Sequence, residues 1–374
     1  THSGSGDLDV SINDLGVAGI LTQSGSGDFN IASPAETPAS GWGMFSGTET
    51  TNGADLNETT KYALEWDTQT YDTAVFSYSG ANPSRITVLE TGNYFIAYHL
   101  PVYDSGYSGS NENRMATQSE FRVDGVKESI GFAESSFIRG DGGGVNHFES
   151  SNTYTGMVSI SQNSYLEVFT GNEGGDGAEV MWTEGAGFFI EKIEDAEDIF
   201  FGTGTQSTNG TDLCAGTFDG WEYDMEWTEV VEDTPFTHSD ATNPNQITIG
   251  DTGTYYVAVN IPNYTSDSTE RAAVGLRLEL DGSEVSGTRG LTGYMRARST
   301  QGNFYASIHY AGLVEVTSGE VLTVGVSMMG ADGNVTVGGN NATILIRKMS
   351  SNDGLFKAAV SGLVSGSDWN PATP

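Results

Sequence analysis

Short runs of apolar residues alternate with clusters of Gly, Ser, Thr, Asn and Asp along most of this chain of 374 residues. The runs are five to eight residues long and rich in β-branched and aromatic side chains, and helical periodicity is nearly absent. This pattern is typical of an all-β sandwich or barrel. Strands are predicted at 62–66, 74–78, 84–89, 92–101, 117–124, 126–133, 147–160, 164–170, 178–182 and 186–193.

One of these runs occurs twice. The stretch "ETGNYFIAYHLP" at 90–101 returns as "DTGTYYVAVNIP" at 251–262, an offset of 161 positions. Further along, "YTGMVSI" (154–160) matches "YAGLVEV" (310–316) at an offset of 156, and "FFIEKI" matches "ILIRKM" at the same offset. Because the order of the matches never changes, the chain is a tandem duplication of a unit near the usual size of one domain. The second copy is expected to repeat the strands of the first.

Side chains alternate across a strand, so the repeated stretch has two faces. The first face is large and apolar in both copies: Tyr94, Ile96, Tyr98 and Leu100, then Tyr255, Val257, Val259 and Ile261. We expect this face to point into the sandwich. The second face carries one aromatic, one small and one polar residue in each copy: Phe95, Ala97 and His99, then Tyr256, Ala258 and Asn260.

A strand that is apolar on one side and half-apolar on the other is often covered on both. A neighbouring subunit is one way to cover the second face. The alternative is that Phe95 and Tyr256 are ordinary exposed aromatic residues. The pattern of the strand leaves both interpretations open.

The stretch "GNYFIAY" (92–98) resembles the Gly-x-Tyr-x-Phe-x-Tyr/Phe signature of the tumour-necrosis-factor and complement globular-head superfamily. The segment "YAGLVEVTSGEVLTVGV" (310–326) is similar to that family's Gly-x-x-x-x-Leu-x-x-Gly-Asp-x-Val-x-Val segment. The resemblance covers both copies. It implies a ten-stranded jelly roll that forms tight three-fold trimers. It also places the second face at the trimer axis: Phe95, Ala97 and His99 in copy one, and Tyr256, Ala258 and Asn260 in copy two.

The sequence therefore predicts an all-β chain of two tandem ten-stranded jelly-roll β-sandwiches with an extended N-terminal tail and a short C-terminal tail. The expected bounds are 1–43 for an N-terminal docking tail, 44–194 for the first jelly roll, 195–349 for the second, and 350–374 for the C-terminal tail. The apolar spacing in the last segment fits one short helix. Phe200 and Phe201, in the bridge between the two jelly rolls, either join them or begin the next strand.

Charge narrows the range of partners. The chain has 50 Asp and Glu against 15 Lys and Arg, a formal charge of -35. Such a surface repels nucleic acid and anionic membrane, so we expect neither as a partner. The single cysteine, Cys214, excludes an intrachain disulfide framework. The first ten residues lack the basic and then apolar pattern of a secretion signal.

No constellation of residues predicts catalysis, because the five histidines have no metal-ligand spacing and the acidic residues are spread along the whole chain. We therefore do not expect an enzyme or a required cofactor. Calcium is the one metal candidate. The acidic loops at 171–179 and 330–334 occupy equivalent places in the two copies, and Asp176, Glu179 and Asp332 would supply hard oxygen ligands. The alternative is plain solvated acidic turns.

These observations favour a non-enzymatic structural protein of a virus particle. The leading hypothesis is a head decoration or fibre protein of a marine tailed phage, trimeric, and attached on the virion surface through its tails to other virion proteins, with the capsid as the expected partner. The alternative is a secreted or cell-surface binding module, an adhesin that recognises host-surface glycans. A subunit of an extracellular filament is the third hypothesis.

Overall fold

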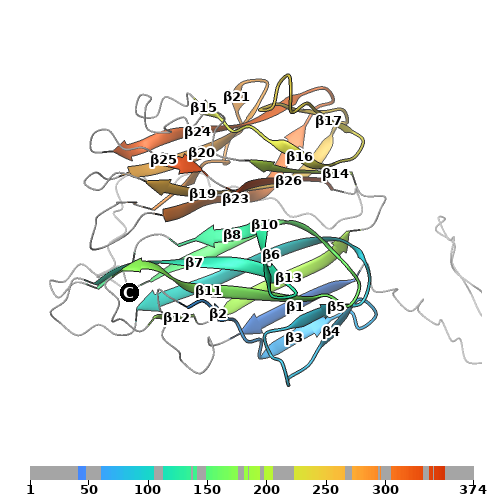
Figure 1. The fold of residues 1–374 in the computed structure, drawn as a ribbon. Helices are drawn as coiled ribbons and strands as arrows, with labels where there is room; N and C mark the ends of the chain where they lie inside the picture. The colour runs from blue at the N-terminus through green and yellow to red at the C-terminus, as the bar shows by residue number, and fades with distance from the viewer. Residues whose placement is uncertain are drawn as a thin grey trace, which may run out of the picture. The chain divides into compact units, whose positions relative to one another are not determined.

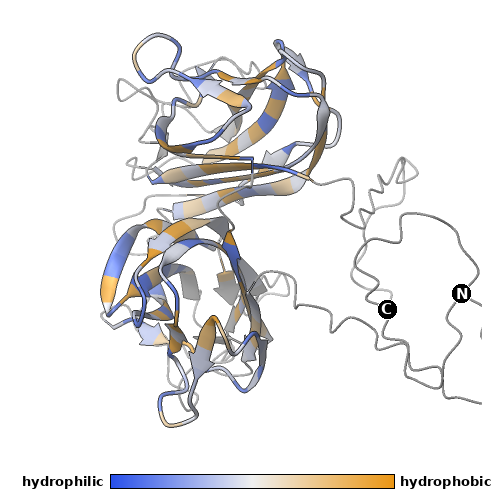
Figure 2. Cartoon of the chain, turned by 90° about the vertical axis from the view of Figure 1, so that its right-hand side faces the viewer, coloured by the Kyte–Doolittle hydropathy of each residue, from blue (hydrophilic) through white to orange (hydrophobic). Residues whose placement is uncertain are grey.

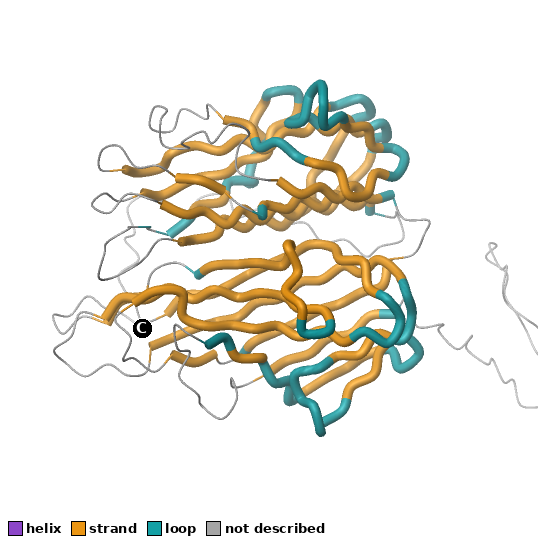
Figure 3. The backbone as a smooth tube through the Cα atoms, in the orientation of Figure 1, coloured by secondary structure: helices purple, strands orange, loops and turns teal. Residues whose placement is uncertain are grey.

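The structure is a computed structural model that describes residues 41–47, 60–104, 113–135, 138–140, 149–175, 181–183, 185–193, 198–204, 223–265, 272–293, 295, 305–331, 337–339 and 341–349. Strands and their connecting loops make up this part of the chain, which contains no helix (Figure 3) and hence no helix that could cross a membrane. Residues 1–40 and 350–374 lie outside the described residues. They hold nearly all of the two predicted tails, including the expected C-terminal helix.

Strands β1 to β13, blue to green in Figure 1, form two antiparallel sheets that we call the first sandwich. One sheet has the order β10 (Glu149–Ile160), β6 (Gly92–Asp104), β13 (Ala186–Ile193), β1 (Trp42–Gly47) and β3 (Thr68–Tyr71), with β12 (Met181–Thr183) on β6. The other has the order β4 (Phe76–Tyr78), β5 (Ile86–Val88), β11 (Tyr165–Gly175), β7 (Asn113–Val123) and β8 (Val126–Glu134), with β2 (Tyr62–Ala63) on β11 and β9 (Ile138–Gly140) on β7.

Strands β14 to β26, yellow to red in Figure 1, form the second sandwich. Its first sheet has the order β16 (Thr228–Glu232), β14 (Ile199–Gly204), β26 (Ala342–Lys348), β19 (Gly253–Thr265) and β23 (Tyr305–Val316), with β25 (Val337–Gly339) on β19. Its second sheet has the order β17 (Phe236–His238), β18 (Ile247–Ile249), β24 (Val321–Ala331), β20 (Ala272–Leu280) and β21 (Ser283–Glu284), with β15 (Tyr223–Asp224) on β24 and β22 (Gly290–Leu291) on β20.

The two sandwiches share one topology. In both, strands far apart in the sequence are neighbours in a sheet, as where β6 lies between β10 and β13 and β19 lies between β23 and β26. Each sheet has a continuous path of five strands, which gives ten main strands in each sandwich beside three short strands off these paths. Two antiparallel sheets whose strands alternate between the layers in this way form a jelly roll. The predicted fold, two tandem ten-stranded jelly rolls, is confirmed.

Each sandwich encloses its own apolar core. The first face of β6 and the first face of β19 are buried at every position, which confirms that these side chains point inward. Trp66 and Trp227, at equivalent positions of the two copies, are among the largest fully buried side chains. Figure 2 shows the alternation of apolar and polar residues along the strands that produces these cores. Burial of one face per strand is what the period of two in the sequence dictates.

The sequence pattern predicts neither β1 nor β3. Strand β1 begins at Trp42, just before the expected start of the first jelly roll at 44, and buries only alternate residues. Strand β3 has the sequence "TQTY" and is largely exposed. Both are strands because of hydrogen bonding to their neighbours, β13 and β1. In the second copy, both alternatives for Phe200 and Phe201 hold: they lie in β14, Phe200 packs in the second core, and Phe201 packs between the sandwiches.

Two hairpins, β7–β8 and β20–β21, turn on an Asp-Gly pair. Asp124 and Gly125 have φ angles of 52° and 77°, and Asp281 and Gly282 have φ angles of 48° and 74°. Two successive positive φ angles define the type I′ turn, whose twist matches that of the flanking strands. Each Asp carboxylate also accepts a backbone N–H from the adjacent strand, at 2.9 Å and 3.0 Å. The turn therefore fixes the register of its hairpin.

We expect Gly282→Ala to destabilise the chain by roughly 1 kcal/mol, because alanine disfavours the left-handed backbone. The added Cβ would meet no atom within 4 Å, so sterics add nothing. Urea unfolding of the full chain measures the loss. Gly187→Ala is the matched control, since its Cβ is equally free and its φ is not left-handed. Equal losses in the two variants would contradict the assignment of the cost to the turn.

Candidate interaction surface

The second faces of β6 and β19 meet within one chain. The ring centroids of Phe95 and Tyr256 lie 6.0 Å apart with an interplanar angle of 71°, an edge-to-face contact. Phe189 contacts Phe95 in the same geometry, at 5.9 Å. Phe95 is buried and Tyr256 is half-buried, so neither is an ordinary exposed aromatic residue.

An apolar cluster joins the two sandwiches, and we call it the inter-copy cluster. Its buried members are Phe95, Met157, Ile193, Ile199, Phe201, Ala258 and Leu345, with Ala97, Ile130, Phe189, Val231 and Tyr256 packed against them. Strands β8 and β10 of the first sandwich contact β19 and β23 of the second, and β10 also contacts β26. β8, β10 and β23 are end strands of their sheets, and Phe95 and Tyr256 lie on the outer faces of β6 and β19, so each sandwich contributes both an edge strand and part of an outer sheet face.

Hydrogen bonds accompany this apolar contact. Asn260 is fully buried, and its Nδ2 donates to the backbone carbonyl of Phe132 at 2.9 Å. The backbone N–H of Glu134 donates to Ser307 Oγ at 2.8 Å. A buried amide without partners would cost free energy, and the bond to Phe132 offsets that cost on the donor side. The acceptor side is not compensated, since Asn260 Oδ1 has no partner among the described residues.

His309 and one ion pair lie in the same contact. His309 Nε2 is 3.1 Å from Thr155 Oγ1. Burial, and then the charge of the nearby His99, lowers the pKa of His309 to about 4, so its ring is neutral at pH 7. Arg347 Nη1 and Glu191 Oε2 form an ion pair at 2.9 Å between the two sandwiches. Both ion-pair side chains are partly exposed, so the pair adds at most about 1 kcal/mol.

The residues that the family resemblance places at a trimer axis lie on or beside this contact. Four belong to the inter-copy cluster: Phe95, Ala97, Tyr256 and Ala258. Asn260 is buried against the first sandwich, whereas His99 is exposed and its Nδ1 lies 2.9 Å from Thr153 Oγ1. The sequence pattern favours a second face that is covered. In β19 this face is covered by the other copy within the same chain. The trimer axis itself stays a prediction.

The sequence pattern misses the partners of these residues. Met157 pairs in register with Phe95, and Leu345 pairs in register with Ala258, so each shares a sheet face with a predicted residue. A search for second-face residues on the neighbouring strands would have found both. Ile130, on β8, comes from the opposite sheet of the first sandwich, and no local pattern points to it.

The predicted calcium ligands Asp176, Glu179 and Asp332 lie outside the described residues. The part of the chain that the structure describes contains no group of three or more His, Cys, Asp or Glu side chains placed to hold a metal ion. The calcium site stays a prediction.

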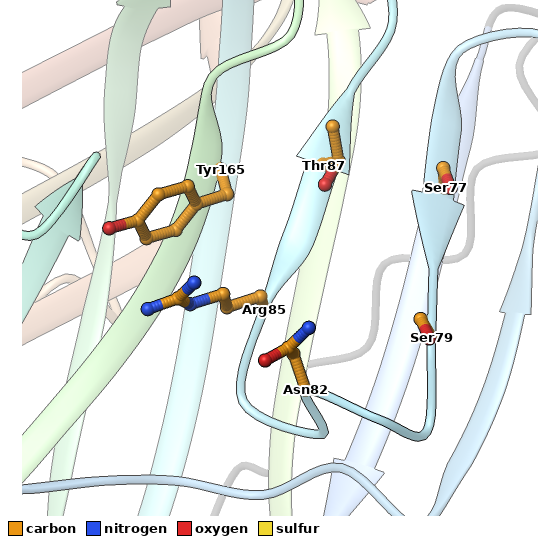
Figure 4. Close-up of a pocket in the computed structure, with 6 residues that line it drawn as sticks. All are labelled: Ser77, Ser79, Asn82, Arg85, Thr87 and Tyr165. Atoms are coloured by element: carbon orange, nitrogen blue, oxygen red, sulfur yellow. The ribbon is translucent and has the colours of Figure 1, made fainter.

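A small polar hollow lies on the first sandwich, over β4, β5 and β11 (Figure 4). It is lined by Ser77, Ser79, Asn82, Arg85, Thr87 and Tyr165. The Arg85 guanidinium lies 4.3 Å from the centroid of the Tyr165 ring, and Arg85 Nε is 3.3 Å from Glu167 Oε1. Hydroxyl and amide groups beside an aromatic ring suit a polar ligand such as a sugar. The hollow is open and would enclose only a small part of such a ligand.

No protein-family model matches the chain, and no curated protein matches it. Several solved structures are similar to part of it. The crystal structure of murine APRIL at pH 8.0 is 14% identical, with a TM-score of 0.28, and the match covers 41% of this chain and 99% of that one. Murine APRIL at pH 5.0 is 15% identical, with a TM-score of 0.28, and the match covers 41% of this chain and 99% of that one. Eiger TNF from S. frugiperda is 12% identical, with a TM-score of 0.28, and the match covers 43% of this chain and 99% of that one. These distant neighbours are jelly-roll proteins of the tumour-necrosis-factor family, and the fold assignment here rests on the strand order.

Phe201→Ala should cost about 3 kcal/mol or more, because it leaves a cavity in the inter-copy cluster. Met44 occupies the same register position in the first sandwich and is exposed, so Met44→Ala should cost less than about 0.5 kcal/mol. Urea unfolding of both full-length variants measures the difference. Equal costs would show that the first sandwich does not cover this face of the second.

Acid should weaken the contact through His309. The pKa of His309 in the folded chain lies below its ordinary value. Between about pH 6.5 and pH 4 the unfolded chain therefore binds a proton at His309 that the folded chain does not bind. The free energy of unfolding falls as the pH drops through this range. Urea unfolding midpoints at about pH 7.5 and pH 5 measure this. Wild type should lose on the order of 1 kcal/mol more than His309→Gln, which keeps a polar group near Thr155 but does not titrate. Equal losses would contradict the role of His309.

Proposed function

We propose that this chain is a non-enzymatic structural protein that assembles with copies of itself on the surface of a virus particle. The observation that carries the proposal is the inter-copy cluster, which buries apolar side chains between two jelly rolls and makes them one building unit. In the form we favour, three chains associate into a head decoration or fibre protein of a marine tailed phage. The tails, predicted at 1–43 and 350–374, attach it to the capsid or to other virion proteins, the first tail through the residues before β1 (Trp42–Gly47).

Two further observations support self-assembly at an exposed location. Trp42 and Met44 lie on the outer face of β1 and are 36% and 55% exposed, although both are large and apolar. Exposed apolar side chains that lie together on one sheet face commonly mark a surface that another protein covers. The formal charge of -35 favours high solubility and disfavours contact with nucleic acid.

The polar hollow of Figure 4 favours a second candidate, a secreted or cell-surface module that binds glycans. In this alternative Tyr165 would stack on a sugar, and Asn82 with the neighbouring serines would bind its hydroxyls. The sequence suggests four tyrosines, expected on loops, that would stack on sugars: Tyr103, Tyr107, Tyr264 and Tyr294. Tyr103 and Tyr264 lie instead in β6 and β19, where Tyr264 is half-buried, and Tyr107 and Tyr294 lie outside the described residues. A glycan array would test it, with Tyr165→Ala as the variant that should lose any signal.

The self-assembly proposal predicts that the full chain has three times its monomer mass by multi-angle light scattering. A chelator should leave this mass unchanged, because the proposed assembly includes no metal ion. Mass spectrometry of purified particles from cultures that produce the chain should detect it as a stoichiometric component. Its absence from such particles would contradict the virion location while leaving the trimer intact, and a single-chain mass would contradict the trimer.

A further inference from the structure

The polar hollow of Figure 4 is built around one arginine that its neighbours hold in place. The Arg85 guanidinium lies against the Tyr165 ring, 4.3 Å from its centroid, and Arg85 Nε lies 3.3 Å from Glu167 Oε1. Glu167 is buried, and its Oε1 also accepts a hydrogen bond from Ser84 Oγ at 2.8 Å. The carboxylate and the aromatic ring therefore position the guanidinium before a ligand binds.

The two terminal nitrogens of Arg85 are not used by the fold. Within the described residues the guanidinium makes its hydrogen bond through Nε alone, which leaves Nη1 and Nη2 without a partner there. A guanidinium presents its N–H groups as a planar fork, and this fork matches the two oxygens of a carboxylate. The hollow thus holds one half of a bidentate pair.

Hydroxyl and amide groups that make few hydrogen bonds line the rest of the hollow. Ser77 and Asn82 make no side-chain hydrogen bond to any described residue, and Ser79 Oγ accepts only one backbone N–H, at 3.3 Å. In Figure 4 the two serines lie on one side of the hollow, and Arg85 and Tyr165 lie on the other. A ligand with an anionic group at one end and hydroxyl groups at the other would match both sides.

The second sandwich shows what the fold itself requires at this place. The pairing of β18 with β24 repeats that of β5 with β11 and gives the equivalent positions. Three residues differ there: Gln246 stands for Arg85, Val321 for Tyr165 and Thr323 for Glu167. The polar lining recurs in part, since Asn82 returns as Asn243. The jelly roll forms without the charge and the ring, so in the first sandwich these groups can serve a ligand.

We infer that the hollow binds the carboxylate of an acidic sugar, with Arg85 as the anchor. The carboxylate oxygens accept from Nη1 and Nη2, and the sugar hydroxyls form hydrogen bonds with Ser77, Ser79 and Asn82. The hollow has a volume of about 190 Å³, below the roughly 300–1,000 Å³ of sites that enclose a drug-sized ligand, so it takes one sugar unit. The inference rests on the second candidate function, the glycan-binding module, and is independent of self-assembly.

The charge of the whole chain, -35, opposes an anionic ligand only at long range, because exposed charges are screened over about 8 Å at physiological ionic strength. Near the hollow the balance is different. The outer face of this sheet carries four of the chain's 15 Lys and Arg residues: Lys61, Arg85, Arg122 and Lys127. A carboxylate has one negative charge, against nearly two for a phosphate monoester, and is therefore the anion that a single arginine neutralises.

D-glucuronate is the probe that tests the inference. D-glucose lacks the carboxylate and acetate lacks the sugar, so these two compounds are the matched probes. Ligand-detected NMR titration of the full chain at pH 7 gives the affinity for each. Glucuronate should bind, and each of the other two should bind about tenfold more weakly or less, since each loses a set of hydrogen bonds.

Two full-length variants assign the binding to Arg85. Arg85→Gln carries the residue type that the second sandwich has at this position, and it should weaken glucuronate binding about tenfold or more. Arg289→Gln is the matched control, since Arg289 is also exposed and paired with a glutamate, Glu284, at 2.8 Å, but lies in the second sandwich. The control should bind glucuronate as the wild type does. Urea unfolding shows that both variants are folded.

Every other result overturns a stated part of the inference. If glucose binds as tightly as glucuronate and Arg85→Gln has no effect, the acidic ligand is wrong while the glycan-binding candidate stands. If acetate binds as tightly as glucuronate, the sugar is wrong. If none of the three probes binds, or if Arg289→Gln weakens binding as much as Arg85→Gln, the assignment of the hollow is wrong. The glycan array and the light-scattering mass then decide the two candidate functions separately.

Discussion

The structure depends on one constraint: the sheet that contains β19 is apolar on both faces and has to be covered on both. Its inward face is covered by its own sandwich, and its outward face is covered by the other copy through the inter-copy cluster. At the Phe95–Tyr256 contact, two residues that occupy equivalent positions in the duplicated strand pack against each other. Removing this cover would expose a continuous strip of the face, from Phe201 to Ala258 and Leu345.

The two copies share a fold but not an environment, and their side chains have diverged accordingly. At one position of the second face, Asn260 is fully buried and bonded across the contact, while His99 in the other copy is exposed. At another, Phe201 fills the cluster where the other copy has the smaller Met44. The two copies meet partly through equivalent positions, as at Phe95 and Tyr256, and partly through different ones, which explains these differences.

Much of the fold could be predicted from the sequence, because it follows from local periodicity and from the repeat. The alternation in the stretch from Tyr94 to Leu100 identified the core face, and the duplication identified two sandwiches of the same topology. Strands β1 and β3 could not be predicted, because their conformation comes from hydrogen bonding to sheet neighbours and not from their composition. The second-face residues were found by alternation alone. Of their partners, Met157 and Leu345 follow from the same alternation on the neighbouring strands, whereas Ile130 could not be predicted, because it comes from the opposite sheet of the first sandwich.

The short connection between the sandwiches has a consequence for the strength of their contact. Ile193 ends one sandwich, Ile199 begins the next, and both belong to the inter-copy cluster. A tether this short holds the two surfaces at an effective local concentration in the millimolar range or above. Surfaces held in this way need only weak intrinsic affinity to stay together, which lets the contact tolerate an uncompensated group such as the Asn260 carbonyl oxygen. Covalent linkage also fixes the ratio of the two jelly rolls at one to one.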